Sequence, residues 1–186
     1  MNIALTKPMG LADWVKLYRL YLEAFPAAER KPFAMIVSMY RKGKSDVWCL
    51  RRGDAFAGLA ITINGPDVIL LDYLAVAKRS RGEGVGTGAL ALLQETYQGK
   101  GFFLEIESTY ENAPNQAQRQ KRKGLYLSCG LQEMHVLVKL FGVNMELIGN
   151  GCELDFAQYK AFYRDNYNQW AADHITPYDG KALADK

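Results

Sequence analysis

The feature that most constrains this chain is a strand-length apolar run followed by a glycine-rich loop and a helical pattern. The run is Leu71–Val76, and the loop Arg81–Thr87 holds Gly82, Gly84 and Gly86. Backbone N–H groups at the start of a helix have no intrahelical partner, and the helix dipole is positive at that end. Glycine also lets a bound group approach the backbone closely. The stretch therefore predicts an anion site, for which a pyrophosphate is a natural occupant.

A dinucleotide-binding fingerprint fits part of the same stretch. Gly84–Ala89 reads GxGxxA, and Glu107 follows at about the distance expected of the acid that binds the ribose. That fingerprint places its first glycine directly after the strand, whereas residues 78–83 intervene here. A doubly wound sheet also needs repeated βαβ units, and this chain offers one. These two differences count against a nicotinamide-dependent oxidoreductase, which stays an alternative because the fingerprint itself matches.

The remaining periodicity predicts a mixed α/β (α+β) fold. Helical spacing indicates helices over residues 11–25, 33–42, 85–98, 118–129 and 155–170. Strand patterns occupy residues 47–51, 55–64, 68–76, 102–107, 131–140 and 143–148. We expect a twisted, mostly antiparallel sheet of about six or seven strands, flanked by about four or five helices and containing one parallel pair.

Length and composition indicate one soluble domain. The 186 residues suffice for a single core, and we expect one domain over 1–186, with 152–186 as a C-terminal helical extension. A net charge of +3 is too small to favour a nucleic-acid or membrane partner. The three cysteines have no metal-binding spacing, so no metal is expected. With no signal-peptide pattern, we expect a cytoplasmic monomer or homodimer.

Two ordered motifs resemble those of one family. Leu74-Ala75-Val76 followed by Arg81-x-x-Gly84-x-Gly86 resembles the coenzyme A pyrophosphate loop of the GNAT acetyltransferases. Residues 126–131, from Tyr126 to Gly130 and Leu131, resemble the later tyrosine-to-glycine motif, in which phenylalanine usually follows the glycine. The resemblance runs from the first helix to about residue 148. It implies a GNAT-like fold that splays at the parallel strand pair.

The resemblance also implies how acetyl-CoA would bind. The backbone of the strand end would pair with the pantetheine arm, and the loop would hold the pyrophosphate. The implied contacts are Leu74, Ala75, Val76, Arg81, Gly82, Gly84, Val85, Gly86 and Thr87. The 3′-phosphate could be reached by Arg119, Lys121, Arg122 or Lys123.

The implied chemistry is direct attack of an amine on the thioester, with Tyr126 as general acid. The amine must first lose a proton, since a lysine-like amine has a pKa of about 10.4. Asp72 and Glu107 are the candidate bases, and Glu105 shares a strand face with Glu107 by the two-residue period.

The acceptor is a small-molecule or peptide amine whose identity stays open. By analogy with the family, the connection between the first two helices flanks it, which indicates Glu29, Arg30 and Phe33. A non-catalytic GNAT-fold module that binds acyl-CoA or a partner protein is the second alternative.

Overall fold

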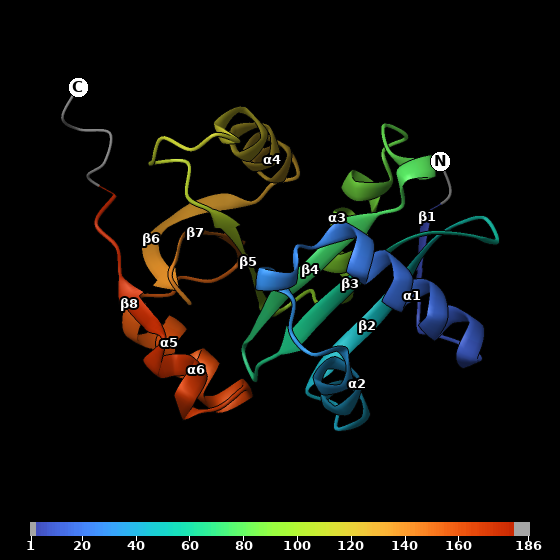
Figure 1. Cartoon of the computed structure of the whole chain (residues 1–186), viewed down its shortest axis with the longest axis horizontal. Helices are drawn as coiled ribbons and strands as arrows, with labels where there is room; N and C mark the ends of the chain where they lie inside the picture. Colours follow the sequence, from blue (N-terminus) through green and yellow to red (C-terminus); the bar gives the residue numbers. More distant parts are fainter. Residues whose placement is uncertain (1–2, 181–186) are drawn as a thin grey trace. The chain divides into compact units, whose positions relative to one another are not determined.

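The computed structural model describes residues 3–180, which form eight β-strands and six α-helices (Figure 1). They divide into two compact units between Gln98 and Gly99. Unit 1 contains β1 (Ile3–Thr6), α1 (Gly10–Ala24), η1 (Ala27–Glu29), α2 (Phe33–Arg41), β2 (Ser45–Arg52), β3 (Ala55–Asn64), β4 (Val68–Val76), η2 (Lys78–Ser80) and α3 (Val85–Thr96). Unit 2 contains β5 (Gly101–Glu107), α4 (Gln116–Ser128), β6 (Gln132–Leu140), β7 (Val143–Asn150), α5 (Phe156–Asn166), α6 (Gln169–Asp173) and β8 (Ile175–Pro177).

Unit 1 is built on antiparallel strands in the order β1-β2-β3-β4. Helix α1 packs on β3 and β4, and α3 packs on β1, β2 and β4. The apolar stripe of α1 turns Leu17, Leu20 and Tyr21 into the core and leaves Leu11 and Leu22 exposed. The core of this unit is therefore an apolar layer between β3–β4 and α1.

Strand β4 contains a β-bulge at Asp72. Ile61 of β3 pairs with Tyr73, while the next residue, Thr62, pairs with Leu71. Asp72 is thus the extra residue on β4, and the simple alternation expected from the sequence is interrupted there. A bulge re-aims the side chains next to it, which here are Asp72 and the buried Tyr73.

Unit 2 has antiparallel strands in the order β5-β7-β6-β8. The predicted hairpin of β6 and β7 is confirmed, and its turn holds Phe141 and Gly142 at positive φ. The register of β6 shifts between Glu133 and Leu137, so that residues 134–136 lie opposite the single residue Leu147.

Two differences from the sequence-based expectation concern short elements. Strands β1 and β8 were not predicted, because four and three residues are too few for a period to be read. The predicted helix over 155–170 is wrong in its continuity, since it is divided into α5 and α6. Asn168 is extended at the break, and its side chain accepts a hydrogen bond from the backbone N–H of Ala171 (2.8 Å). The single-domain assignment stays a prediction.

The approach of β3 to β4 predicts a stability difference between two glycine substitutions. A Cβ added to Gly58 would collide with the backbone oxygen of Ala75 and lie 2.9 Å from Leu50 Cδ1. Gly58→Ala should therefore lower the free energy of unfolding by about 1–3 kcal/mol. Gly124, inside α4, has open space around it, and Gly124→Ala should raise that free energy by about 0.5–1 kcal/mol. Urea denaturation checks both; equal effects would contradict the close approach.

Candidate functional site

The glycine-rich loop of unit 1 presents backbone donors at the start of α3. Gly82 and Gly84 adopt positive φ values of 77° and 70°. Gly84 is the N-cap and supplies no side-chain cap, while the first helical bond runs from Gly88 N–H to Gly84 O (2.9 Å). The N–H groups of Val85, Gly86 and Thr87 therefore precede the hydrogen-bonded part of the helix. This arrangement suits an anion.

The loop also has room for a ligand. A Cβ at Gly86 would meet one side-chain atom, Val76 Cγ2 at 3.7 Å, and a Cβ at Gly82 would meet nothing within 4 Å. The side chain of Val85, the first residue of α3, is buried and anchors the start of the helix in the core. The exposed Arg81 lies beside the loop, where its Nε donates to the Val76 carbonyl (3.2 Å).

The predicted pantetheine contacts lie at the end of β4, next to this loop. Leu74 and Ala75 pair with residues of β3, and so does Val76, opposite Gly58. Unit 1 thus brings together the whole set predicted to contact acetyl-CoA: Leu74, Ala75, Val76, Arg81, Gly82, Gly84, Val85, Gly86 and Thr87.

The connection between α1 and α2 is fastened to β4. The Tyr73 hydroxyl donates to the Glu29 carbonyl (2.9 Å) and accepts from the Lys31 N–H (3.1 Å). The Tyr21 hydroxyl donates to the Lys31 carbonyl (3.0 Å), and Lys31 Nζ forms an ion pair with Asp72 Oδ1 (2.5 Å). Burial raises the pKa of Tyr73, so its hydroxyl stays protonated. The roles of Tyr73 and Lys31 were not predicted from the sequence, because their contacts depend on the bulge in β4.

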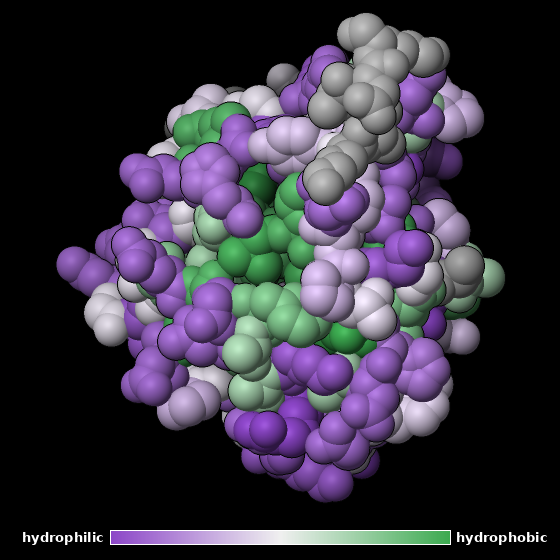
Figure 2. All heavy atoms as spheres, turned by 90° about the vertical axis from the view of Figure 1, so that its left-hand side faces the viewer, coloured by the Kyte–Doolittle hydropathy of each residue, from purple (hydrophilic) through white to green (hydrophobic). Residues whose placement is uncertain are grey.

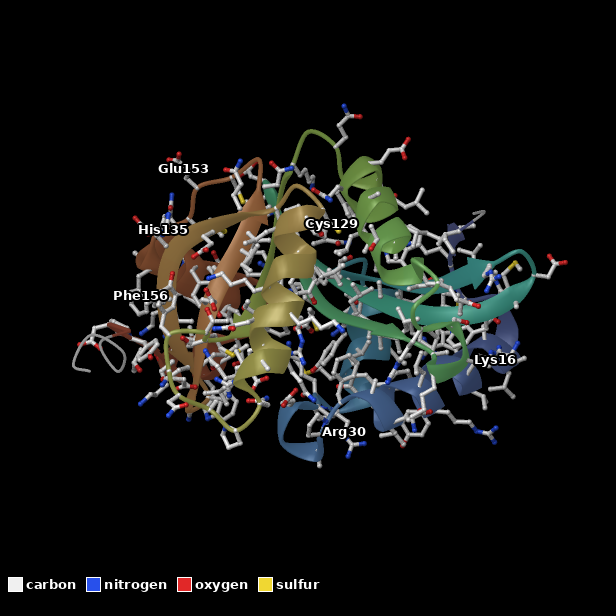
Figure 3. The ribbon with its side chains drawn as sticks, turned by 90° about the horizontal axis from the view of Figure 1, so that it is seen from above. Lys16, Arg30, Cys129, His135, Glu153 and Phe156 are labelled. Atoms are coloured by element: carbon white, nitrogen blue, oxygen red, sulfur yellow. The ribbon has the colours of Figure 1, made fainter. Side chains whose placement is uncertain are left out.

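Besides Glu29, the residues predicted to flank the acceptor are Arg30 and Phe33, and these two differ in their surroundings. Arg30 is half-buried on the segment that joins α1 to α2 (Figure 3). Phe33 packs against the rings of Tyr18 and Tyr21, with ring centroids 5.0 and 5.5 Å away. Phe33 therefore belongs partly to the aromatic core of unit 1.

Tyr126 is half-buried on α4, close to the helix end at Ser128. Burial raises the pKa of its phenol, and the nearby Arg122 charge opposes this only in part. Within the described residues the Tyr126 hydroxyl has no hydrogen-bond partner. It is a protonated donor that a ligand could use.

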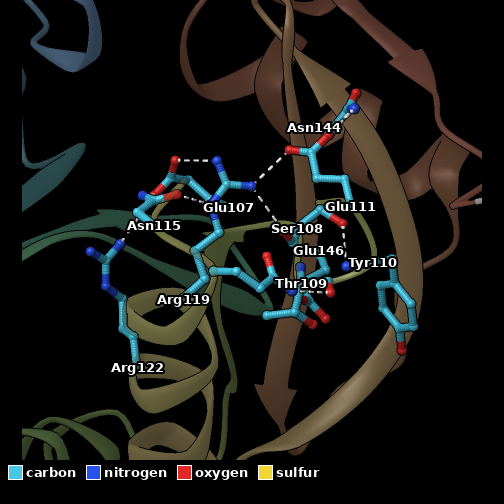
Figure 4. A network of polar contacts seen from close by, with 11 residues as sticks. Glu107, Ser108, Thr109, Tyr110, Glu111, Asn115, Arg119, Arg122, Asn144 and Glu146 are labelled. Atoms are coloured by element: carbon cyan, nitrogen blue, oxygen red, sulfur yellow. Dashed lines mark hydrogen bonds and ion pairs between the residues drawn. The ribbon is translucent and has the colours of Figure 1, made fainter. Parts of the chain in front are cut away.

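Arg119 is occupied by a network within unit 2 (Figure 4). Its guanidinium donates to Glu107 (2.8 Å), Glu111 (2.7 Å), Asn115 (2.9 Å) and the Ser108 carbonyl (2.9 Å). These bonds fasten the start of α4 to the end of β5. Because these acceptors occupy its N–H groups, Arg119 is poorly suited to bind a phosphate. The same guanidinium holds Glu107 in an ion pair.

Lys123 is occupied in a similar way. Its Nζ lies 2.7 Å from Glu146 Oε2 and 2.9 Å from Glu133 Oε2, and Glu146 is 3% exposed. Burial alone would lower the pKa of Lys123, but its bonds to the two glutamates outweigh burial and raise it. Of the four basic residues considered for the 3′-phosphate, Lys121 and Arg122 are therefore the exposed ones.

The two glutamates bridged by Lys123 line a pocket of about 270 Å³ in unit 2. Its walls include Val136, Leu137 and Leu147 beside the bulge of β6. Figure 2 looks onto this unit and shows apolar side chains gathered in a hollow with hydrophilic side chains around it.

Glu105 and Glu107 are held by different helices, although they are two residues apart on β5. Glu107 is bonded to α4 through Arg119 and, more weakly, Arg122 (3.7 Å), and it accepts a long hydrogen bond from Asn115 at the N-cap of that helix (3.4 Å). Glu105 accepts bonds from Tyr159 and Tyr163 of α5. Two residues on the same strand are thus each bonded to a different helix, Glu107 to α4 and Glu105 to α5.

The dinucleotide-binding alternative lacks its structural context. β4 ends at Val76, and η2 lies between it and Gly84, the first glycine of the fingerprint. Each unit pairs its own strands antiparallel, unlike a doubly wound sheet.

Comparison with known families decides the identity. Residues 14–124, more than half of the chain, match the family model described as the acetyltransferase (GNAT) family. This protein belongs to the GNAT acetyltransferase family. It is accordingly an acyltransferase, and the family resemblance read from its two motifs is confirmed. No curated protein matches the chain at the sequence level.

Solved GNAT structures share the fold at low sequence identity. A GNAT-family protein from Bacteroides thetaiotaomicron is 16% identical with a TM-score of 0.73, over 92% of this chain and 99% of that one. A Bacillus subtilis acetyltransferase solved in complex with CoA is 17% identical (TM-score 0.57, 79% and 95% covered). The ribosomal-protein-S18-alanine N-acetyltransferase of Escherichia coli is 18% identical (TM-score 0.59, 82% and 96% covered). The predicted GNAT-like α/β fold is thus confirmed.

Residues 3–180 of this GNAT protein contain neither a cluster of metal-binding side chains nor a membrane-spanning helix. Among residues 3–180, no group of three or more His, Cys, Asp or Glu side chains is arranged to hold a metal ion. Within the same range, no helix has the length and apolar character needed to cross a membrane.

The Arg119 network predicts that lysine cannot replace arginine at this position. A lysine ammonium lacks the planar fork that serves four acceptors, so buried acceptors would lose partners. Arg119→Lys should lower the free energy of unfolding by about 2 kcal/mol, measured by urea denaturation. Gln120→Ala, exposed on the same helix, should change it by less than about 0.5 kcal/mol. Wild-type stability of Arg119→Lys would refute the structural assignment.

Proposed function

We propose that this GNAT protein transfers the acetyl group of acetyl-CoA to a primary amine, whose nitrogen attacks the thioester directly. The observation that carries the proposal is the uncapped, glycine-rich start of α3 next to the end of β4, in a chain of this family. The open space at Gly82 and Gly86 suits a pyrophosphate against the backbone. Acetyl-CoA is thus the co-substrate that the loop fits.

The residues proposed to bind acetyl-CoA contact it with backbone N–H groups and with positively charged side chains. The N–H groups of Val85, Gly86 and Thr87 bind the pyrophosphate, and Arg81 adds a charge-assisted bond. Lys121 and Arg122 are proposed for the 3′-phosphate, because both are exposed on α4. A backbone N–H at the end of β4 stabilises the oxyanion that forms on the thioester carbonyl.

Tyr126 is proposed as the general acid. Collapse of the tetrahedral intermediate expels a thiolate, and a phenol close to it can supply a proton or a strong hydrogen bond. Two observations support the assignment: the hydroxyl is unbonded within the described residues, and burial raises its pKa. Both favour a donor that is protonated at neutral pH.

A strand carboxylate is proposed to take the proton of the amine. Asp72 and Glu107 are the candidates from the sequence. Asp72 forms an ion pair with Lys31, and Glu107 forms ion pairs with Arg119 and, at 3.7 Å, with Arg122. An ion pair favours the charged carboxylate and so opposes proton uptake. Either residue could act as base only if its cationic partner moved away.

The acceptor is proposed to be a small-molecule or peptide amine that contacts the segment from Glu29 to Phe33. That segment is fastened to β4 by Tyr73, which places it beside the proposed acetyl-CoA contacts of unit 1. The alternative, a non-catalytic acyl-CoA-binding module, would bind acetyl-CoA without turnover. A thiol-release assay with acetyl-CoA across a panel of amines separates the two.

The loop geometry predicts that Gly86→Asp abolishes acetyl-CoA binding without unfolding the protein. The backbone at Gly86 accepts a side chain without strain, so the loss would come from bulk and negative charge beside the pyrophosphate. Gly86→Ala, which adds no charge, should weaken binding less. Calorimetric titration measures both; wild-type affinity of Gly86→Asp would exclude this binding site.

Removal of one hydroxyl tests the general acid. Tyr126→Phe should leave the acetyl-CoA dissociation constant unchanged, while kcat falls by about 10-fold to 1000-fold, because only transition-state stabilisation is lost. Steady-state kinetics with an identified acceptor measure the change. A wild-type kcat would make Tyr126 a structural residue.

A further inference from the structure

The segment that joins α1 to α2 is clamped on both sides of Arg30. The Tyr73 hydroxyl donates to the Glu29 carbonyl (2.9 Å) and accepts from the Lys31 N–H (3.1 Å). The Tyr21 hydroxyl donates to the Lys31 carbonyl (3.0 Å). Tyr21 and Tyr73 are 1% and 6% exposed, so both are fixed in the core of unit 1. The backbone that carries Arg30 is therefore held by two buried side chains.

The guanidinium of Arg30 is an unused charge in this segment. Lys31, the next residue, has its ammonium in an ion pair with Asp72 (2.5 Å). Arg30 is half-buried, yet within residues 3–180 its guanidinium forms no hydrogen bond and no ion pair, and the adjacent Glu29 does not pair with it. Burial raises the pKa of the Tyr21 hydroxyl, and the Arg30 charge is one of the groups that oppose this rise. The guanidinium thus lies near the clamp.

An arginine held in this way is suited to bind a carboxylate. Partial burial removes water from a guanidinium, and an anionic partner replaces the lost hydrogen bonds. The N–H donors of arginine form a planar fork that matches the two oxygens of a carboxylate. Because the backbone on both sides of Arg30 is already fixed, little further ordering is needed when an anion binds.

The clamp also ties Arg30 to the strand that is proposed to contact acetyl-CoA. Tyr73 lies on β4, and the same strand continues into Leu74–Val76, the proposed contacts of the pantetheine arm. A strand rises about 3.3 Å per residue, so Tyr73 and the end of β4 are about 10 Å apart. All of these residues belong to unit 1. An amine and a carboxylate separated by a few carbon atoms could therefore occupy both places.

From this geometry, and resting on the proposed function, we infer that the acceptor is an amine that also carries a carboxylate, and that Arg30 binds this carboxylate. Tyr21 and Tyr73 are positioning residues, because they hold the backbone on either side of Arg30. A site built around a charged hydrogen-bonding group rejects analogues that leave this group without a partner. Arg30 is therefore the residue that selects amino carboxylates among the amines.

The experiment measures selectivity between acceptors that differ by one charge. A series of ω-amino carboxylates of increasing length is compared with the corresponding uncharged amides, by thiol release from acetyl-CoA. For the best carboxylate, wild-type protein should give a kcat/KM at least about 10-fold higher than for its amide, because the amide cannot form the charge-assisted bonds.

Substitution of Arg30 should remove this preference. Arg30→Gln should reduce the ratio of the two kcat/KM values to about one, and Arg30→Lys should keep part of it, since an ammonium retains the charge without the planar fork. Arg41→Gln is the matched control: it removes the same charge from an exposed position in the last turn of α2, and the ratio should stay at its wild-type value. A loss of stability alone would lower both kcat/KM values together and leave their ratio unchanged.

Tyr73→Phe tests the clamp. Without the hydroxyl, Glu29 and Lys31 lose a shared hydrogen-bond partner, so KM for the carboxylate acceptor should rise about 3-fold to 10-fold, with a smaller change in kcat. The acetyl-CoA dissociation constant should stay at its wild-type value. Tyr97→Phe is the control, because it removes another bonded hydroxyl of unit 1, which donates to Asp46. It should leave KM for the acceptor unchanged.

The outcomes separate this inference from the proposed function. Amide and carboxylate acceptors turned over equally well by wild-type protein, or a wild-type ratio in Arg30→Gln, would overturn the inference and leave amine acetylation standing. A wild-type KM in Tyr73→Phe would reject the positioning role of the clamp. If wild-type protein turns over no amine of either charge, the proposed function is refuted, and this inference with it.

Discussion

The pairing of β3 with β4 is the interaction on which the rest of unit 1 depends. It allows the close approach at Gly58, and it contains the bulge that makes Asp72 the extra residue. From the bulge onward, β4 holds the α1–α2 connection through Tyr73 and ends beside the glycine-rich loop. One strand thus fixes both the proposed acetyl-CoA contacts and the segment proposed to flank the acceptor.

In unit 2 the corresponding constraint is the attachment of α4 to the strands. Arg119 and Lys123 place their charges among carboxylates of β5, β6 and β7, and burial makes these contacts stronger than surface ion pairs. Tyr126 follows Lys123 by one helical turn, so its position is set by the same bonds. The basic run of α4 is therefore chiefly structural, and Lys121 and Arg122 are its exposed members.

Three strand carboxylates illustrate how surroundings separate residues of one chemical type. Asp72 pairs with Lys31, Glu107 pairs with Arg119, and Glu105 accepts hydrogen bonds from Tyr159 and Tyr163. A neighbouring cation lowers the affinity of a carboxylate for a proton. Asp72 and Glu107 are thus structural counter-ions for as long as their cationic partners stay in place.

The sequence by itself determined the family, the fold class and the glycine-rich loop, because these depend on local patterns. Glycine at residues 82, 84 and 86 sets the backbone of the loop, and apolar periodicity sets most helices and strands. The partners of Asp72, Glu105, Glu107 and Arg119 were decided by the tertiary structure alone. Those partners depend on the β4 bulge and on contacts such as Glu105 with Tyr163, 58 residues apart in the chain, which no local pattern encodes.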